Sequence, residues 1–117
     1  MKVYAFDVDE TLAISGGPIQ TADALALRDQ GHLVGLCGNW AAISLKHPEM
    51  MRSFHFFGPM VMPKEMFLGQ IRSYLPAEEY VMVGNIPGVS GASNDQAAAE
   101  LARWRFIQEA EFARGTR

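Results

Sequence analysis

The sequence contains one cysteine, no long apolar run and no excess of basic residues. A single cysteine, Cys37, excludes an internal disulfide framework and is typical of a reducing cytosol. No apolar run approaches the ~18 residues that a membrane-spanning helix needs. The net charge of −3 provides no general basic field for a nucleic-acid backbone. We therefore expect a cytoplasmic protein with no membrane span and no general affinity for nucleic acids.

The size and composition of the chain predict one folded domain across residues 1–117. Hydrophobic residues make up 49% of the chain and charged residues 20%, a composition that excludes intrinsic disorder. We find no repeat, low-complexity stretch or linker in the sequence that would divide it.

Apolar, β-rich segments alternate with segments of helical spacing along the chain. The pattern predicts strands at residues 2–8, 33–37, 54–57, 80–83 and 105–107, and helices at residues 19–30, 40–46, 63–74, 95–103 and 108–114. Such alternation is typical of α/β proteins with an open sheet of parallel strands and flanking helices. We therefore predict an α/β fold with about five parallel strands.

Ligands of open parallel sheets bind beyond the carboxyl ends of the strands. The residues that follow the predicted strands, or open a helix nearby, are therefore the candidate site residues. They are Asp7, Asp9, Cys37, Gly38, Asn39, Lys64, Gly84 and Asn85.

The pattern Asp7-Val8-Asp9-Glu10-Thr11 carries the strongest indication of chemistry. Two carboxylates about 4 Å apart repel by roughly 4 kcal/mol at an effective dielectric near 20, so they need a cation, a lysine or a shared proton. In such a site Asp7 could attack phosphorus or bind Mg²⁺, and Asp9 could exchange a proton with a leaving group. The alternative is a structural turn in which Asp9 or Thr11 caps a helix.

In chain order, four segments of the sequence resemble the four motifs of the haloacid dehalogenase-like (HAD) superfamily. The segments are residues 7–12, residues 36–39, the pair Pro63-Lys64 that opens a helix, and residues 81–84 with Asn94-Asp95. The resemblance covers nearly the whole chain and is most specific in the first motif.

The resemblance implies a Rossmann-like sheet and a Mg²⁺-dependent phosphoryl-transfer site. It implies that Asp7 is the nucleophile, forming an aspartyl-phosphate, and also a metal ligand. Asp9 is then the general acid/base and places its backbone carbonyl on the metal, while Lys64 screens Asp7 and holds phosphoryl oxygens. The segment Cys37-Gly38-Asn39 is expected to bind the substrate phosphate together with Lys64.

Two residues depart from the motif pattern. Cys37 stands where the second motif has threonine or serine, and its S–H is a weaker donor, although the backbone N–H groups of Gly38 and Asn39 could still bind phosphate. Asn85 stands where the fourth motif has an acid directly after the strand, so the metal site lacks one negative charge.

Asp95 supplies that charge if the loop of residues 86–94 folds back over the site. The alternative, compatible with the first, is that Asp95 lies in the first turn of a helix capped by a Ser93-x-x-Gln96 capping box. We therefore expect Asp7, Asp9, Asn85 and Asp95 to be the candidate Mg²⁺ ligands.

Neither residues 13–18 nor the segment between Cys37 and Lys64 has room for a cap domain. A capless chain resembles those members of the family that act on macromolecules or close their site with a neighbouring subunit. A stretch rich in methionine and phenylalanine, residues 50–67, is expected mainly to pack in the core, and secondarily to form a homo-oligomer interface.

These features predict a capless, Mg²⁺-dependent HAD-type phosphatase acting on a phosphorylated substrate whose identity the sequence leaves open. The alternative is a weakened HAD-fold domain that binds a partner or phosphorylated ligand, which Cys37 and Asn85 favour and which intact Asp7, Asp9 and Lys64 oppose. A dehalogenase is the least favoured reading, because paired acids and a lysine suit phosphoryl chemistry.

Overall fold

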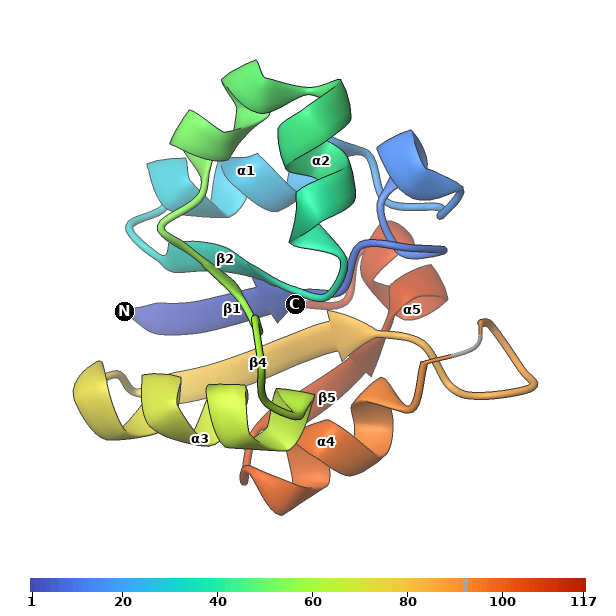
Figure 1. The fold of residues 1–117 in the computed structure, drawn as a ribbon. Coiled ribbons are helices and arrows are strands. Elements are labelled where there is room, and N and C mark those ends of the chain that lie inside the picture. The colour runs from blue at the N-terminus through green and yellow to red at the C-terminus, as the bar shows by residue number, and fades with distance from the viewer. Residues whose placement is uncertain (92) are drawn as a thin grey trace.

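One sheet of five parallel strands, in the order β3-β2-β1-β4-β5, forms the centre of the molecule (Figure 1). The structure is a computed structural model and describes residues 1–91 and 93–117. The strands are β1 (Lys2–Phe6), β2 (Leu33–Cys37), β3 (Phe56–Gly58), β4 (Glu79–Gly84) and β5 (Arg105–Gln108). This confirms the predicted α/β fold with a five-stranded, all-parallel, Rossmann-like sheet.

The strand order creates a switch point at the middle of the sheet. From β1 the chain moves outward through β2 to β3, and it then returns to the other side of β1 to form β4 and β5. The crevice beyond the carboxyl ends of β1 and β4 is therefore the place where this class of sheet binds ligands.

Helices cover both faces of the sheet (Figure 1). They are α1 (Thr21–Asp29), α2 (Trp40–Lys46), α3 (Lys64–Tyr74), α4 (Asp95–Leu101) and α5 (Glu109–Ala113), with short 3₁₀ turns at Ala13–Ser15 and Pro48–Ser53. One buried cluster joins Phe6 of β1 to α1, α2 and α5, through Leu27, Ile43 and Phe112. A second cluster on the opposite face joins β1 and β4 to α3 and α4. Because residues of β1 alternate between these clusters, the central strand is buried on both sides.

The predicted boundaries hold for β2 and α2 and shift at other elements for local reasons. Strand β1 ends at Phe6 rather than residue 8, because the amides of Thr11 and Leu12 both donate to the Val8 carbonyl in a turn. Strand β3 covers Phe56–Gly58 rather than residues 54–57, because the 3₁₀ turn before it extends to Ser53.

Helix limits differ for similar reasons. Helix α1 begins at Thr21 rather than residue 19, because Ile19 forms a β-bridge with Leu12. Helix α4 ends at Leu101 rather than residue 103, because Arg103 adopts a left-handed φ of 62° that a helix cannot continue through. Among the helices of the described residues, none has the length and apolar character needed to cross a membrane.

Candidate functional site

Asp7 is the first residue after the central strand, and its side chain is buried at the switch point. Its backbone amide donates to the Val83 carbonyl at 2.9 Å, which extends the pairing of β1 with β4 by one step. The residue is only 2% exposed, so its carboxylate depends on protein groups for hydrogen bonds and charge.

Lys64 provides the positive charge beside Asp7. Its Nζ lies 2.9 Å from Asp7 Oδ1 and 2.6 Å from Asp95 Oδ1, so one ammonium bridges two carboxylates. Lys64 is the first residue of α3. The structure therefore brings together three of the residues that the sequence singled out, from three separate elements.

Asp95 is fully buried at the first position of α4, where it shares the Lys64 ammonium with Asp7. Its Oδ2 accepts a hydrogen bond from the Asn85 backbone amide at 2.8 Å. A side chain at Gly84 would place Cβ 2.3 Å from that same oxygen, so this close approach requires glycine at the end of β4. Both Asp95 oxygens are thus engaged by donors.

The expected Ser93-x-x-Gln96 capping box is wrong. Asn94 is the N-cap of α4, and its side-chain oxygen accepts a hydrogen bond from the Ala97 amide at 3.2 Å. Asn94 takes this role because it directly precedes the helix and its short side chain reaches the amide three residues on.

The electrostatics of the site follow from burial and from the excess of carboxylate. Burial raises the pKa of Asp7 from its ordinary 3.8 to about 7; Lys64 opposes this shift and Asp95 adds to it. Burial acts to lower the pKa of the Lys64 ammonium, but Asp7 and Asp95 outweigh it, so that pKa is raised. Lys64 is therefore held in its charged form, while Asp7 is balanced between its two forms near neutral pH.

Asn85 follows β4 directly and is 1% exposed. Its Nδ2 donates to the Glu10 carbonyl at 3.1 Å, to the Ser90 carbonyl at 3.3 Å and to Glu109 Oε2 at 3.2 Å. Its Oδ1 accepts from the Thr11 hydroxyl at 3.2 Å. An amide satisfies this environment because one end of the side chain faces acceptors and the other faces a donor.

Asp9 lies outside this buried cluster and is exposed. Ser15 Oγ donates to its Oδ1 at 3.0 Å, and Asn39 Nδ2 donates to its Oδ2 at 3.2 Å. The next residue, Glu10, has a left-handed φ of 60°, a conformation that a non-glycine residue adopts at some cost in energy. The turn thus directs Asp7 inward and leaves Asp9 in contact with solvent.

The segment after β2 offers fewer groups for binding phosphate than the sequence predicted. Cys37 is fully buried in the core cluster of α3 and α4, and burial raises the pKa of its thiol to about 12, so the group stays neutral. The Gly38 amide donates to the Gly58 carbonyl at 2.9 Å and is engaged within the sheet. Gly38 itself packs against Asp7, because a Cβ there would lie 2.2 Å from Asp7 Oδ1.

Two further buried polar residues, Thr11 and Glu109, belong to the site. Neither of them was assigned to it from the sequence. The Thr11 hydroxyl lies between Asp7 Oδ2, at 3.4 Å, and Asn85 Oδ1, at 3.2 Å. Glu109, 3% exposed, begins α5 and accepts from Asn85. A signal for Glu109 was present, because it directly follows β5 and so lies at the same edge of the sheet as Asp7 and Asn85.

Two oxygens near Thr11 are of the type that hard cations such as Mg²⁺ bind. Asp7 Oδ2 and Asn85 Oδ1 both face the Thr11 hydroxyl, so one carboxylate oxygen and one amide oxygen converge. Oxygen donors of this kind suit Mg²⁺, which often uses only one or two protein carboxylates and completes its shell with water and phosphate. Within residues 1–91 and 93–117, no group of three or more histidine, cysteine, aspartate or glutamate side chains is arranged to hold a metal ion.

The fold and the buried polar cluster define an α/β protein with a Rossmann-like parallel sheet and a charged site at its switch point. The chain has no significant match among protein-family models, curated proteins or solved structures.

Proposed function

We propose that the protein is a capless HAD-type phosphohydrolase that removes phosphate from a phosphomonoester. The observation that carries the proposal is the Asp7–Lys64 pair at the carboxyl end of the central strand, with Asp9 exposed two residues further on. One carboxylate is held beside a fixed cation and a second is free to exchange protons with solvent. Phosphoryl transfer needs such positioned charge more than it needs other chemical groups.

In the first step, an ionised Asp7 oxygen forms a bond to phosphorus and the bond from phosphorus to the ester oxygen breaks. Protonated Asp9 gives its proton to the departing oxygen, so the alcohol leaves neutral and Asp9 becomes a carboxylate. Lys64 stabilises negative charge on the phosphoryl oxygens and on Asp7 before attack.

In the second step, the aspartyl-phosphate at Asp7 is hydrolysed. Asp9 takes a proton from water, the water oxygen bonds to phosphorus, and the bond from phosphorus to Asp7 breaks. The products are the alcohol and inorganic phosphate, and Asp9 is again protonated for the next cycle. The Ser15 and Asn39 hydrogen bonds hold Asp9 in position for both proton transfers.

We propose Mg²⁺ as the cofactor, which Asp7 and Asn85 would hold, with the Asp9 carbonyl contributing as the resemblance implies. When bound, Mg²⁺ would supply positive charge to neutralise the phosphoryl oxygens. Asp95 fixes the ammonium instead, because its oxygens are held by Lys64 and a backbone amide, whereas the Thr11 hydroxyl that contacts Asp7 and Asn85 can rotate away.

The test is phosphate release from a panel of phosphomonoesters with and without Mg²⁺. We expect Mg²⁺-dependent release by the wild-type protein and none by Asp7→Asn, because the amide cannot attack phosphorus and loses a charged metal ligand. Asp23→Asn, which removes an exposed acid of α1, is the matched control and should retain turnover. Equal turnover by Asp7→Asn and the wild type would remove Asp7 from the role of nucleophile.

The surroundings of Asn85 favour a second candidate, a binding module for phosphorylated ligands. The three hydrogen bonds from Asn85 Nδ2 fix the amide and place a neutral group where the family pattern has a charge. In this alternative, inorganic phosphate binds beside Lys64 but no ester is cleaved. Calorimetric binding of phosphate without turnover of any ester would favour the binding module.

A further inference from the structure

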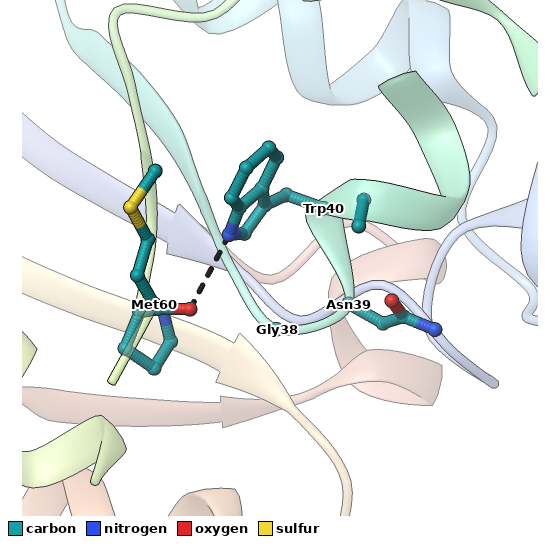
Figure 2. Close-up of a pocket in the computed structure, with 6 residues that line it drawn as sticks. Gly38, Asn39, Trp40 and Met60 are labelled. Atoms are coloured by element: carbon teal, nitrogen blue, oxygen red, sulfur yellow. Dashed lines mark hydrogen bonds between the residues drawn. The ribbon is translucent and has the colours of Figure 1, made fainter. Parts of the chain in front are cut away.

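An apolar cavity of about 430 Å³ opens beside the proposed catalytic site. It is lined by Gly38, Asn39, Trp40, Ala41, Pro59 and Met60, none of which carries a charge. Figure 2 shows the Trp40 indole directed toward the segment that carries Met60, and the indole Nε1 donates to the Pro59 carbonyl at 3.3 Å. The volume lies in the range of roughly 300–1,000 Å³ that small-molecule pockets occupy, although this hollow is wide open to solvent.

Two residues that line the cavity contact the proposed catalytic acids, although neither acid lines it. One lining residue, Gly38, packs directly against Asp7 Oδ1. Another lining residue, Asn39, donates its side-chain hydrogen bond to Asp9. A phosphoryl group at Asp7 would therefore have its ester oxygen near Asp9 and its organic group at the mouth of this cavity.

The walls are suited to a flat or chain-like apolar group. The Trp40 ring packs against Phe57, with ring centroids 5.8 Å apart, and the Pro59 hydrogen bond fixes the indole further. Met60 is 76% exposed, although a residue of its size and polarity is usually covered. A sugar or other polyhydroxyl group would meet few hydrogen-bond partners on such walls.

We propose that this cavity is the leaving-group subsite and that the substrate is a phosphomonoester of an apolar alcohol. The proposal rests on the proposed phosphohydrolase function. On hydrolysis the apolar alcohol leaves from the cavity lined by Trp40 and Met60, and phosphate leaves from the side of Lys64.

The first experiment compares 2-phenylethyl phosphate with ethyl phosphate in the presence of Mg²⁺. Both esters release a primary alcohol, so their intrinsic reactivity is matched and only the apolar group differs. We expect kcat/KM to be about tenfold or more higher for the phenylethyl ester, because the phenyl group is buried on Trp40 and Met60. Equal kcat/KM for the two esters would overturn the subsite and leave the phosphohydrolase function standing.

Two neighbouring variants localise the effect. Met60→Gln keeps the length of the side chain but makes the wall polar, and we expect the phenylethyl-to-ethyl ratio to fall severalfold. Val61→Gln is the matched control, because Val61 is 97% exposed in the same loop and does not line the Trp40 cavity, although it lines an adjoining hollow that shares Pro59 and Met60 with it. An equal fall in both variants would contradict the assignment to the Trp40 cavity.

A binding measurement separates failure of the subsite from failure of the enzyme. The protein has two tryptophans: Trp40 at the cavity, and Trp104, whose Nε1 donates to the Leu68 carbonyl at 3.0 Å in the core. Titration with 2-phenylethylphosphonate, which is not hydrolysed, should shift the Trp40 indole N–H resonance and leave that of Trp104 unchanged.

A Trp40 shift without turnover of any ester would support the apolar subsite and remove the phosphohydrolase proposal. The absence of a saturable Trp40 shift would overturn the subsite. A Trp40 shift that follows protein concentration in the absence of ligand would also overturn it, because a second copy of the chain would then cover the cavity.

Discussion

At the scale of single residues, the site depends on one lysine shared by two buried carboxylates. Lys64 cannot fully compensate both Asp7 and Asp95, so one negative charge remains in excess when both are ionised. The protein accommodates this excess by keeping the pKa of Asp7 close to neutral, mainly through burial. The excess negative charge of the site is therefore relieved by the raised pKa of Asp7.

The elevated pKa of Asp7 predicts a pH dependence of stability in the metal-free protein. Between about pH 4 and 7 the unfolded chain has lost the Asp7 proton while the folded protein retains it. Because the folded state binds more protons, the contribution of Asp7 to the free energy of unfolding is largest at low pH and falls as the pH rises through this window. We expect wild-type stability to decline relative to Asp7→Asn from pH 4 to 7.

Chemical denaturation in EDTA at several pH values measures this difference. The Asp7→Asn side chain does not titrate, so the difference between the two proteins reports the Asp7 contribution together with its interaction with Lys64 and Asp95. Parallel pH profiles for the two proteins would contradict the prediction.

The sequence singled out Asp7, Asp9 and Lys64 as candidate site residues because each occupies a position tied to a strand end or helix start. It did not assign Thr11 and Glu109 to the site, because their role depends on side-chain directions that follow from the strand order. For the same reason, the sequence did not determine whether Asp95 would lie beside Lys64. Sequence spacing does not say whether a nine-residue loop, 86–94, brings its end back to the sheet.

At the scale of secondary-structure elements, Asn85 connects β4 to three other segments. Its Nδ2 holds the turn after β1 through the Glu10 carbonyl, its own loop through Ser90, and α5 through Glu109. This arrangement explains why an amide stands at a position where a metal site would favour a carboxylate.

Asn85→Asp is predicted to lower the stability of the metal-free protein by about 2–4 kcal/mol, because an oxygen would face Glu109 and two carbonyls. Adding Glu109→Gln should recover part of the loss, since the new amide can donate. Mg²⁺ should bind the Asn85→Asp variant more tightly, because the added charge attracts a divalent cation. Thermal unfolding with and without Mg²⁺, together with calorimetry, measures both effects.

The matched control is Asn94→Asp, which replaces the N-cap of α4 by an equally good capping residue and should change stability little. Equal stability of Asn85→Asp and the wild type in EDTA would show that the three Nδ2 hydrogen bonds contribute little. If neither protein binds Mg²⁺ at millimolar concentration, the catalytic proposal fails in favour of the binding module.

Gly38 gives a second prediction at the scale of elements, because it sets the distance between the β2–α2 turn and β1. Gly38→Ala would place Cβ 2.2 Å from Asp7 Oδ1, so the carboxylate or the turn must move. We expect loss of most phosphatase turnover, about 10²-fold or more, since misplacement of a reacting group by about 1 Å has that effect. The measurement is kcat with a small ester such as ethyl phosphate.

Gly69→Ala is the control for the general effect of replacing glycine. Gly69 lies within α3, where no atom approaches a new Cβ within 4 Å, so alanine should add up to about 1 kcal/mol of stability through helix propensity. Turnover by Gly38→Ala at the wild-type level would show that Asp7 can retain its position beside a larger neighbour.

The sequence predicted the five strands and five α-helices and their order, but not the two 3₁₀ turns, because apolar periodicity and glycine or proline positions are local signals. Boundaries moved where nonlocal pairing decided them, as at Ile19, which pairs with Leu12. The capping of α4 was misassigned because serine and asparagine adjoin one another there, and both are good N-caps.

At the scale of the whole molecule, apolar side chains gather on the loop before α3 and on its first turns. Val61 is 97% exposed and Met66 is 55% exposed, and both lie outside the proposed leaving-group subsite. We propose that this surface mediates weak self-association, because burial of such side chains in a homodimer removes apolar area from water.

Sedimentation velocity at increasing protein concentration tests this proposal. We expect a shift toward dimer at tens of micromolar, and a monomer for Met66→Glu. Leu101→Glu, on α4, changes an exposed apolar residue elsewhere and should leave the association unchanged. A monomeric wild-type protein at high micromolar concentration would contradict self-association.

The central place of β1 in the sheet has a consequence for the newly made chain on the ribosome. Strand β1 is synthesised before the other four, yet one of its two neighbours, β4, begins at Glu79. Until β4 emerges, one edge of β1 has no partner and its apolar residues lack one of their neighbouring strands. We therefore expect chains stalled before β4 to be sensitive to protease and prone to aggregation, and resistance to appear only once β4 has been released.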